Sequence, residues 1–147
     1  MKRILIVLTI FSCTSIYAQN EHTGSEKTVR SIVNTDKNQR IVLKTDDEEF
    51  YLKVKFLKSE TSKIKTIFQS SFDTDTRSSS NHWTLNKKDY SIKLSKGKVL
   101  VKMDKKNIGK DDFKAIQEGI NEMFGVLGWS VEEAGLWNFK GNWNIKI

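Results

Sequence analysis

Three short segments between residues 82 and 103 alternate apolar with polar side chains, and this alternation limits the fold more than any other feature of the chain. A period of two is typical of strands that bury one face. Antiparallel pairing sets apolar residues opposite each other in both hairpins: across the turn NKKD Leu85 faces Tyr90 and Trp83 faces Ile92, and across the turn KG Leu94 faces Val99, Ile92 faces Val101 and Tyr90 faces Met103. Gly97 suits the positive φ of a tight hairpin turn. The pattern predicts three consecutive strands with one buried face.

Four earlier segments are also predicted to be strands. They read VRSIVNT, QRIVLKT, FYLKVKFL and KIKTIFQ, at residues 29–35, 39–45, 50–57 and 63–69. The third is the most regular, because its apolar residues occupy one face while Lys53 and Lys55 occupy the other. The fourth is less regular, since Ile67 would point away from Ile64 and Phe68 in a strand. The polar stretch over residues 69–81 is predicted to be a long loop.

A helix is predicted after the last of these strands. Its apolar residues recur at spacings of three and four and form one stripe: Phe113, Ile116, Ile120, Met123 and Leu127. Gly109 is the predicted N-cap, and Gly125 and Gly128 offer the C-terminal stop. Gly119 lies four residues after Ala115, so the two small residues predict a groove that packs closely on the sheet.

The C-terminal stretch GLWNFKGNWNIKI holds two of the four tryptophans. With KGN as a three-residue loop, Phe139 faces Trp143 and Trp137 faces Ile145, and Ile147 extends the same face. Because the rings share a side with isoleucines, we interpret them as core residues of a hairpin. Rings arranged to stack on a ligand would instead share a face with polar groups.

Together these elements predict one α+β domain over residues 28–147. Its sheet is a mostly antiparallel meander, with one helix near the C-terminus and a C-terminal β-hairpin. The pattern leaves open whether the sheet stays open or closes partly or fully into a barrel.

The first 18 residues have the layout of a secretory signal peptide. A positive start precedes an apolar run over residues 4–11, and small or polar residues lead to Ala18. We expect cleavage near Ala18 and a disordered mature start over residues 19–27. The run is too short for a transmembrane span. Cys13, the only cysteine, falls in the expected leader, and the alternative is that Cys13 carries a lipid anchor.

Composition points to an exported bacterial protein with a basic surface. Without the leader the mature chain has no cysteine, whereas small secreted animal domains are usually rich in disulfides. We therefore expect a secreted or periplasmic protein of a bacterial envelope. Loss of Lys2 and Arg3 lowers the basic count from 25 by two, against 18 acidic residues, so the mature net charge is about +5. Arginines are few and lysines are spread along the chain, so nucleic acid is not an expected partner.

Residues typical of metal sites and cofactor sites are scarce. The mature chain has no cysteine and only His22 and His82, so no zinc set is expected within it. Asp73 and Asp75 have the alternate spacing of a calcium loop, but Arg77 stands at the next ligand position and the turn glycine is missing. Glycine-rich phosphate loops are also lacking, so neither a metal nor a cofactor is predicted.

Two classes of function remain. The first is a non-catalytic binding protein, which holds an apolar small molecule between sheet and helix or an envelope protein on the sheet. For the carrier, the predicted lining residues are Phe50, Val54, Trp83 and Ile92. The second is a small envelope hydrolase that uses His82 with a nearby Asp or Ser. No strained GxSxG turn surrounds a serine, so binding is the preferred function and His82 is the candidate catalytic residue of the alternative.

Overall fold

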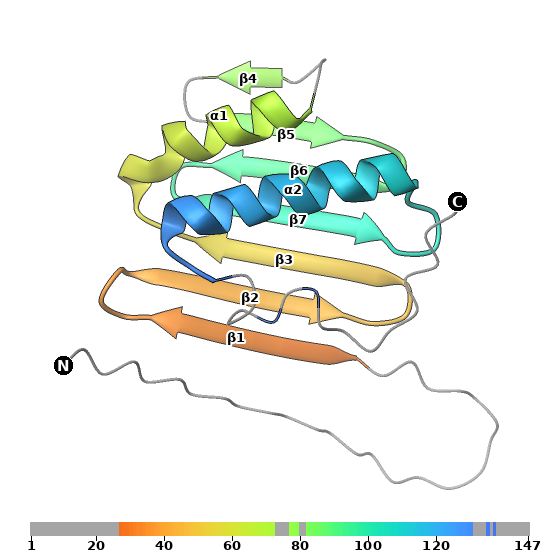
Figure 1. The fold of residues 1–147 in the computed structure, drawn as a ribbon, viewed down its shortest axis with the longest axis horizontal. Coiled ribbons are helices and arrows are strands. Elements are labelled where there is room, and N and C mark those ends of the chain that lie inside the picture. The colour runs from red at the N-terminus through yellow and green to blue at the C-terminus, as the bar shows by residue number, and fades with distance from the viewer. Residues whose placement is uncertain (1–26, 73–76, 80–81, 131–134, 136, 138–147) are drawn as a thin grey trace, which may run out of the picture.

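The chain forms one open antiparallel sheet, and the two α-helices that the structure describes lie on the same face of it (Figure 1). The computed structural model describes residues 27–72, 77–79, 82–130, 135 and 137. The strands are β1 (Thr28–Asn34), β2 (Gln39–Thr45), β3 (Glu49–Lys55), β4 (Arg77–Ser79), β5 (His82–Asn86), β6 (Tyr90–Ser95) and β7 (Lys98–Asp104). The helices are η1 (Lys58–Glu60), α1 (Thr61–Ser71) and α2 (Lys110–Leu127). This arrangement confirms the α+β class and an antiparallel sheet, which is not closed into a barrel.

The order of strands across the sheet is β1-β2-β3-β7-β6-β5-β4, so β1 and β4 are its edges. A three-stranded meander followed by a helix occurs twice, first as β1–β3 with α1 and then as β5–β7 with α2. The two meanders meet where β3 pairs with β7, with Leu52 opposite Val101 and Val54 opposite Val99. This long-range pairing joins, in the middle of the sheet, segments that lie about a third of the chain apart.

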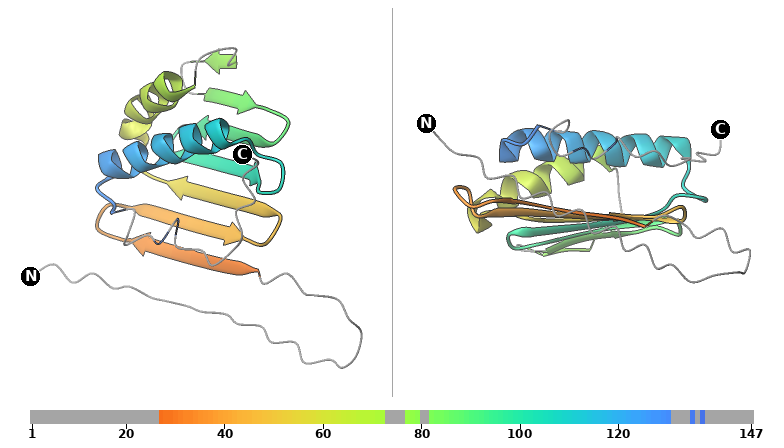
Figure 2. Two further views of the ribbon diagram at one scale, coloured as in Figure 1. Left: turned by 45° about the vertical axis from the view of Figure 1, so that its right-hand side comes forward. Right: turned by 90° about the horizontal axis from the view of Figure 1, so that it is seen from below.

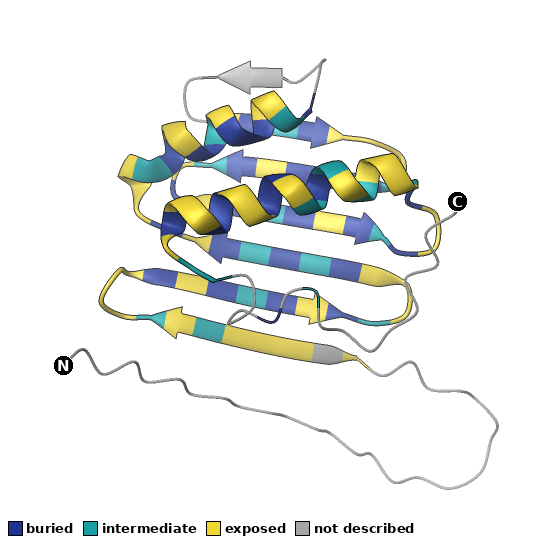
Figure 3. Cartoon of the chain, in the orientation of Figure 1, coloured by how far each residue is buried: buried dark blue, intermediate teal, exposed yellow. Residues whose placement is uncertain are grey.

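The core lies between the sheet and the helices. Figure 2 shows α1 and α2 on one side of the sheet, and Figure 3 shows buried residues alternating along the central strands. In β2, β3, β7, β6 and β5 every second residue is buried. The buried set forms one cluster with the inner faces of both helices. Burial of apolar side chains therefore stabilises the sheet through the face that the helices cover.

The predicted pairing of β6 with β7 is confirmed, with Leu94 opposite Val99 and Ile92 opposite Val101. The predicted pairing of β5 with β6 is wrong by two residues, because Leu85 lies opposite Ile92 and Trp83 opposite Leu94. A shift of two leaves every side chain on its original face, so the alternation of apolar residues cannot distinguish the two registers.

The strand predicted over residues 63–69 is instead the middle of α1. Its apolar residues Ile64, Ile67 and Phe68 are spaced by three and four, so all three fall on one helical face and are buried. The helix start is fixed to the sheet by Thr61, whose hydroxyl donates to the Lys58 carbonyl at 2.7 Å and accepts from the Gly97 N–H at 3.0 Å. The prediction of a single helix is therefore wrong.

The predicted α2 is confirmed with its caps. Gly109 precedes the helix in an extended conformation, and Gly128 ends it in the left-handed region at φ 71°. Gly119 does allow close packing, but the neighbour is α1 rather than the sheet: an added Cβ would lie 3.4 Å from the Phe68 ring. The groove therefore serves the contact between the two helices.

The predicted C-terminal hairpin falls mostly on residues 138–147, which lie outside the described residues. Trp137 is described, and its ring stacks on Phe50 at a centroid distance of 5.8 Å and meets Phe113 edge-on at 5.9 Å. Its indole N–H donates to the Asn121 side chain at 2.9 Å. These contacts agree with the interpretation of this ring as a core residue.

The two glycines near the end of α2 provide a matched stability test. Gly125 is helical and an added Cβ would meet nothing within 4 Å, whereas Gly128 has φ 71°. Gly125→Ala should raise the free energy of unfolding by about 0.5–1 kcal/mol, because alanine favours helix. Gly128→Ala should lower it by about 1–2 kcal/mol, because an L-residue is strained there. Urea unfolding of both variants measures this, and equal effects would contradict the assigned cap.

Tyr90 links the sheet to the first turn of α2 and makes stability depend on alkaline pH. Its hydroxyl donates to Asp112 Oδ1 at 3.1 Å, and burial, together with the Asp112 carboxylate, raises the pKa of Tyr90 well above its usual value of 10. The folded state thus keeps a proton that the unfolded state releases, so stability should fall as pH rises above about 10. Tyr90→Phe should remove this component of the fall, which urea unfolding between pH 8 and pH 11 measures.

Candidate functional site

The face of the sheet turned away from α1 and α2 is strongly basic. We call it the open face, because no described helix or loop covers it (Figure 2). Its outward residues alternate with the buried ones, and six described strands contribute to it: β1, β2, β3, β5, β6 and β7. Seven of these residues are basic: Arg40, Lys44, Lys53, Lys55, Lys93, Lys98 and Lys102. All are exposed except Lys53, which is half-buried.

Like charges stand directly opposite each other on this face. Arg40 pairs with Lys55 on β3, and Lys55 pairs in turn with Lys98 on β7. Directly opposite like charges destabilise a sheet. The ion pairs recorded among the described residues lie elsewhere, between Lys63 and Glu60, Lys106 and Glu48, and Lys114 and Glu118. The repulsion across the open face is therefore not balanced by ion pairs within the described part of the chain.

Tyr51 is the one aromatic ring that the described strands place on the open face. It lies opposite Lys44 on β2 and Lys102 on β7. The two ammonium groups are 5.7 Å and 5.8 Å from the ring centroid, within the range of cation–π attraction. This row therefore holds two cations, one on either side of a phenol ring.

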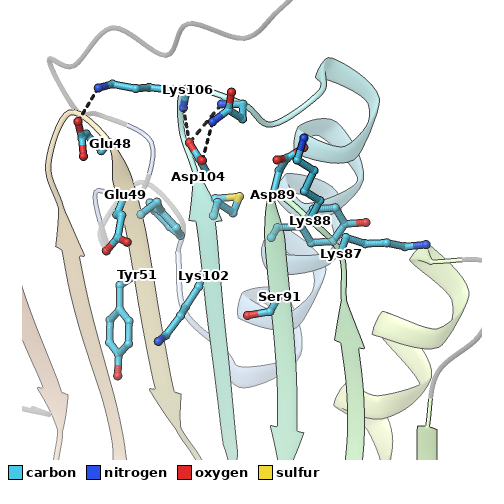
Figure 4. Close-up of a pocket in the computed structure, with 14 residues that line it drawn as sticks. Glu48, Glu49, Tyr51, Lys87, Lys88, Asp89, Ser91, Lys102, Asp104 and Lys106 are labelled. Carbon is cyan, nitrogen blue, oxygen red and sulfur yellow. Dashed lines mark hydrogen bonds and ion pairs between the residues drawn. The ribbon is translucent and has the colours of Figure 1, made fainter.

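Acidic residues of the open face are confined to its end, where Glu49 lies opposite Asp104. A hollow of about 500 Å³ opens there, between the ends of β3, β7 and β6 (Figure 4). The Asn107 amide donates to Asp104 at 2.7 Å and, with the neighbouring backbone N–H groups, holds the pKa of Asp104 below its usual value. Lys102 and Lys106 also border the hollow, so it combines both signs of charge.

A buried lysine lies beside this end of the sheet. Lys105 Nζ donates to the Asp46 carbonyl at 2.5 Å and lies 3.5 Å from the Thr45 hydroxyl. Burial lowers the pKa of Lys105, although Asp47 and Asp46 nearby oppose the shift. The contacts join the β2–β3 turn to the segment after β7, so we interpret Lys105 as a structural tie and not as a nucleophile.

The predicted carrier residues lie on the helix face. Phe50, Val54, Trp83 and Ile92 are at most 1% exposed and belong to the main hydrophobic cluster. Trp83 stacks on Phe68 of α1 at 5.8 Å, which fills the space beside it. The Trp83 indole N–H has no hydrogen-bond partner among the described residues. The structure thus brings these four residues together, as part of a packed core.

His82, the predicted catalytic candidate, is exposed at the start of β5. It lies on the open face opposite Ser95 of β6, and no hydrogen bond or ion pair of its side chain with another described residue is recorded. The partners proposed for it and for calcium, Asp73 and Asp75, lie outside the described residues, as does Ser80. Within the described ranges, no group of three or more His, Cys, Asp or Glu side chains is placed to hold a metal.

The sequence alone did not predict the basic array, by which we mean the seven basic residues of the open face. Part of the pattern that produces it is nevertheless visible in the sequence. Lys53 and Lys55 alternate with the buried residues of β3, as expected, and the other lysines occupy the equivalent polar positions of their strands. The missing information was the pairing of β3 with β7, which places Lys55 beside Lys98. Without knowledge of this pairing, the sequence shows only that lysines are spread along the chain.

Comparisons with protein-family models, curated proteins and solved structures find no match to this chain. In the part of the chain that the structure describes, none of the helices is both long and apolar enough to cross a membrane. The functional argument therefore rests on the geometry of the open face.

The repulsion across the open face predicts an unusual charge reversal. Lys55→Glu would place a carboxylate between Arg40 and Lys98, so the free energy of unfolding should rise by about 0.5–1 kcal/mol at low salt. The gain should shrink as added salt screens the charges. Urea unfolding at two salt concentrations measures it. Lys63→Glu makes the same change of charge but breaks the 3.2 Å pair with Glu60, so it should not stabilise. Destabilisation by Lys55→Glu would contradict the inferred repulsion of Lys55 by Arg40 and Lys98.

Proposed function

We propose that this chain is a non-catalytic binding protein of a bacterial envelope, which holds an acidic protein partner on the open face of its sheet. The observation that supports this most is the row Arg40–Lys55–Lys98, in which three strands present like charges to solvent. Such a row weakens the isolated fold, and a partner that supplies carboxylates would relieve the repulsion.

The shape and charge of the open face suit a macromolecular surface. The seven basic side chains spread over β2, β3, β6 and β7 and so cover an area, not a single cleft. Spread positive charge steers an acidic partner toward the face and speeds association. Half-buried Val42 and Leu100 lie among the lysines and offer apolar contact once a partner excludes water.

A protein partner is favoured over a nucleic acid by the kind of cation and the lack of stacking rings. Arg40 is the single arginine among the seven basic residues, and lysine lacks the forked geometry that binds phosphate through two parallel hydrogen bonds. Tyr51 is the one Phe, Tyr or Trp ring on the described open face, whereas single-stranded nucleic acids bind to several such rings. The proposed export of the chain adds to this preference.

The other functions considered have less support. An apolar ligand between sheet and helix would need space beside Phe50, Val54, Trp83 and Ile92, where side chains of α1 and α2 pack. A hydrolase would need groups that activate His82; its cross-strand partners are Ser79 of β4 and Ser95 of β6, and no carboxylate among the described residues pairs with it across the sheet. His82→Ala separates the classes, because it would abolish hydrolysis but leave a partner bound across β3 and β7.

Site-specific photo-cross-linking in the producing host tests the proposal. A photoreactive residue at position 53 or 93, on the open face, should give one discrete cross-link to an acidic protein. The same residue at position 114, on the outer surface of α2, should not. Adding Lys98→Glu and Lys102→Glu should reduce the yield about tenfold or more, because two attractive pairs become repulsive.

The matched control reverses Lys63 and Lys114, two exposed lysines on the helix side of the molecule. This variant has the same net charge as the open-face variant and should keep the cross-link. Loss of the cross-link in both variants would show that net charge alone matters. Cross-links to nucleic acid, or equal cross-links from positions 53 and 114, would contradict the proposed partner.

A further inference from the structure

The two edges of the sheet differ in how they are protected against pairing. β4 has only three residues, whereas β1 has seven residues with the sequence TVRSIVN. β1 has no proline, and its single charged residue, Arg30, lies on the helix face opposite Leu43, so the side chains of its other face, Val29, Ser31 and Val33, are all uncharged. No described strand pairs with the outer edge of β1, so its backbone N–H and C=O groups on that side lack a strand partner there.

β1 also exposes apolar side chains to solvent. Val29 and Val33 are 48% and 49% exposed, and they are two of the four large exposed hydrophobic residues among those described. They lie opposite Lys44 and Arg40 of β2, so both are on the open face. Ser31, between them along the strand, lies on the same face opposite Val42.

We propose that β1 pairs with β1 of a second copy of this chain, antiparallel and centred on Ser31, so that two sheets become one. In this register Val29 of each copy faces Val33 of the other, and the two Ser31 residues face each other. The dimer thus contains two equivalent contacts between Val29 and Val33, related by the twofold axis, and each contact buries both valines. Arg30 falls opposite Ile32 of the second copy, so no like charges meet. A shift of two residues would instead set Val29 opposite Ser31 and Val33 opposite Lys27, so that neither valine would face a valine.

This pairing has a consequence for the open face. Residues that lie opposite each other in an antiparallel pair share a face, so the open faces of the two copies lie on the same side of the joined sheet. The uncharged face of β1 then forms the seam between two basic arrays. The dimer does not depend on the acidic partner, and the two proposals can fail separately.

A charge exchange across the seam tests the dimer and its register. The protein is expressed with its own leader, purified, and examined by sedimentation up to about 200 µM. Val29→Lys/Val33→Lys and Val29→Glu/Val33→Glu should each weaken the dimer about tenfold or more, because like charges then face each other twice. An equal mixture of the two variants should form a heterodimer. Val29→Lys/Val33→Glu should form a homodimer, since each lysine then faces a glutamate.

A single cysteine provides a second measurement of the register. In a Cys13→Ser background, Ser31→Cys should form a disulfide between copies rapidly, because directly opposite Cβ atoms lie about 5 Å apart. Val29→Cys should not, because the two copies of residue 29 would be about 13 Å apart along the strands. Circular dichroism establishes that each variant is folded.

The unmodified protein remaining monomeric over the whole concentration range would overturn the proposal. A dimer that persists undiminished in Val29→Lys/Val33→Lys would also overturn it, because the contact would then lie elsewhere. Equal rates of cross-linking at positions 29 and 31 would contradict the register. Loss of the dimer leaves cross-linking of position 53 to the acidic partner unaffected, which distinguishes this failure from failure of the proposed function.

Discussion

The pairing of β3 with β7 is the interaction on which the rest of the structure depends. It joins two meanders that are separated by α1, β4, β5 and β6 in the chain, and it does so through seven residue pairs. On one face these pairs set Leu52 against Val101 and Val54 against Val99, beneath the helices. On the other face the same register sets Lys55 against Lys98. The core and the basic array are therefore two faces of one pairing.

The two faces contribute to stability with opposite signs. The helix face buries a continuous set of apolar side chains, and the hydrophobic effect supplies the driving force for folding. The open face opposes this with like charges directly across β2, β3 and β7. A sheet with one solvated face normally alternates opposite charges there, which lowers its energy without altering the core. Under the proposed function, the like charges that weaken the isolated sheet serve to bind the acidic partner.

Local patterns in the sequence predicted the elements whose contacts are local. The register of β6 on β7 and both ends of α2 follow from a hairpin turn and a helical stripe, which need no distant partner. The strand prediction over residues 63–69 is wrong, because the spacings of three and four between Ile64, Ile67 and Phe68 fit one face of a helix and not a period of two. The β5–β6 register was wrong by two, a shift that leaves the pattern of faces unchanged. The open face was missed because it arises from the long-range pairing of β3 with β7.

Lysine footprinting tests most directly the proposal that a partner covers the open face and leaves the helix side free. Intact envelopes and the purified protein are acetylated briefly under the same conditions, and labelling is measured at each lysine. The account predicts that Lys53, Lys98 and Lys102 are labelled several times less in envelopes than in the purified protein, while Lys63 and Lys114 are labelled equally in both. Equal labelling of the two sets of lysines in envelopes and in solution would contradict it.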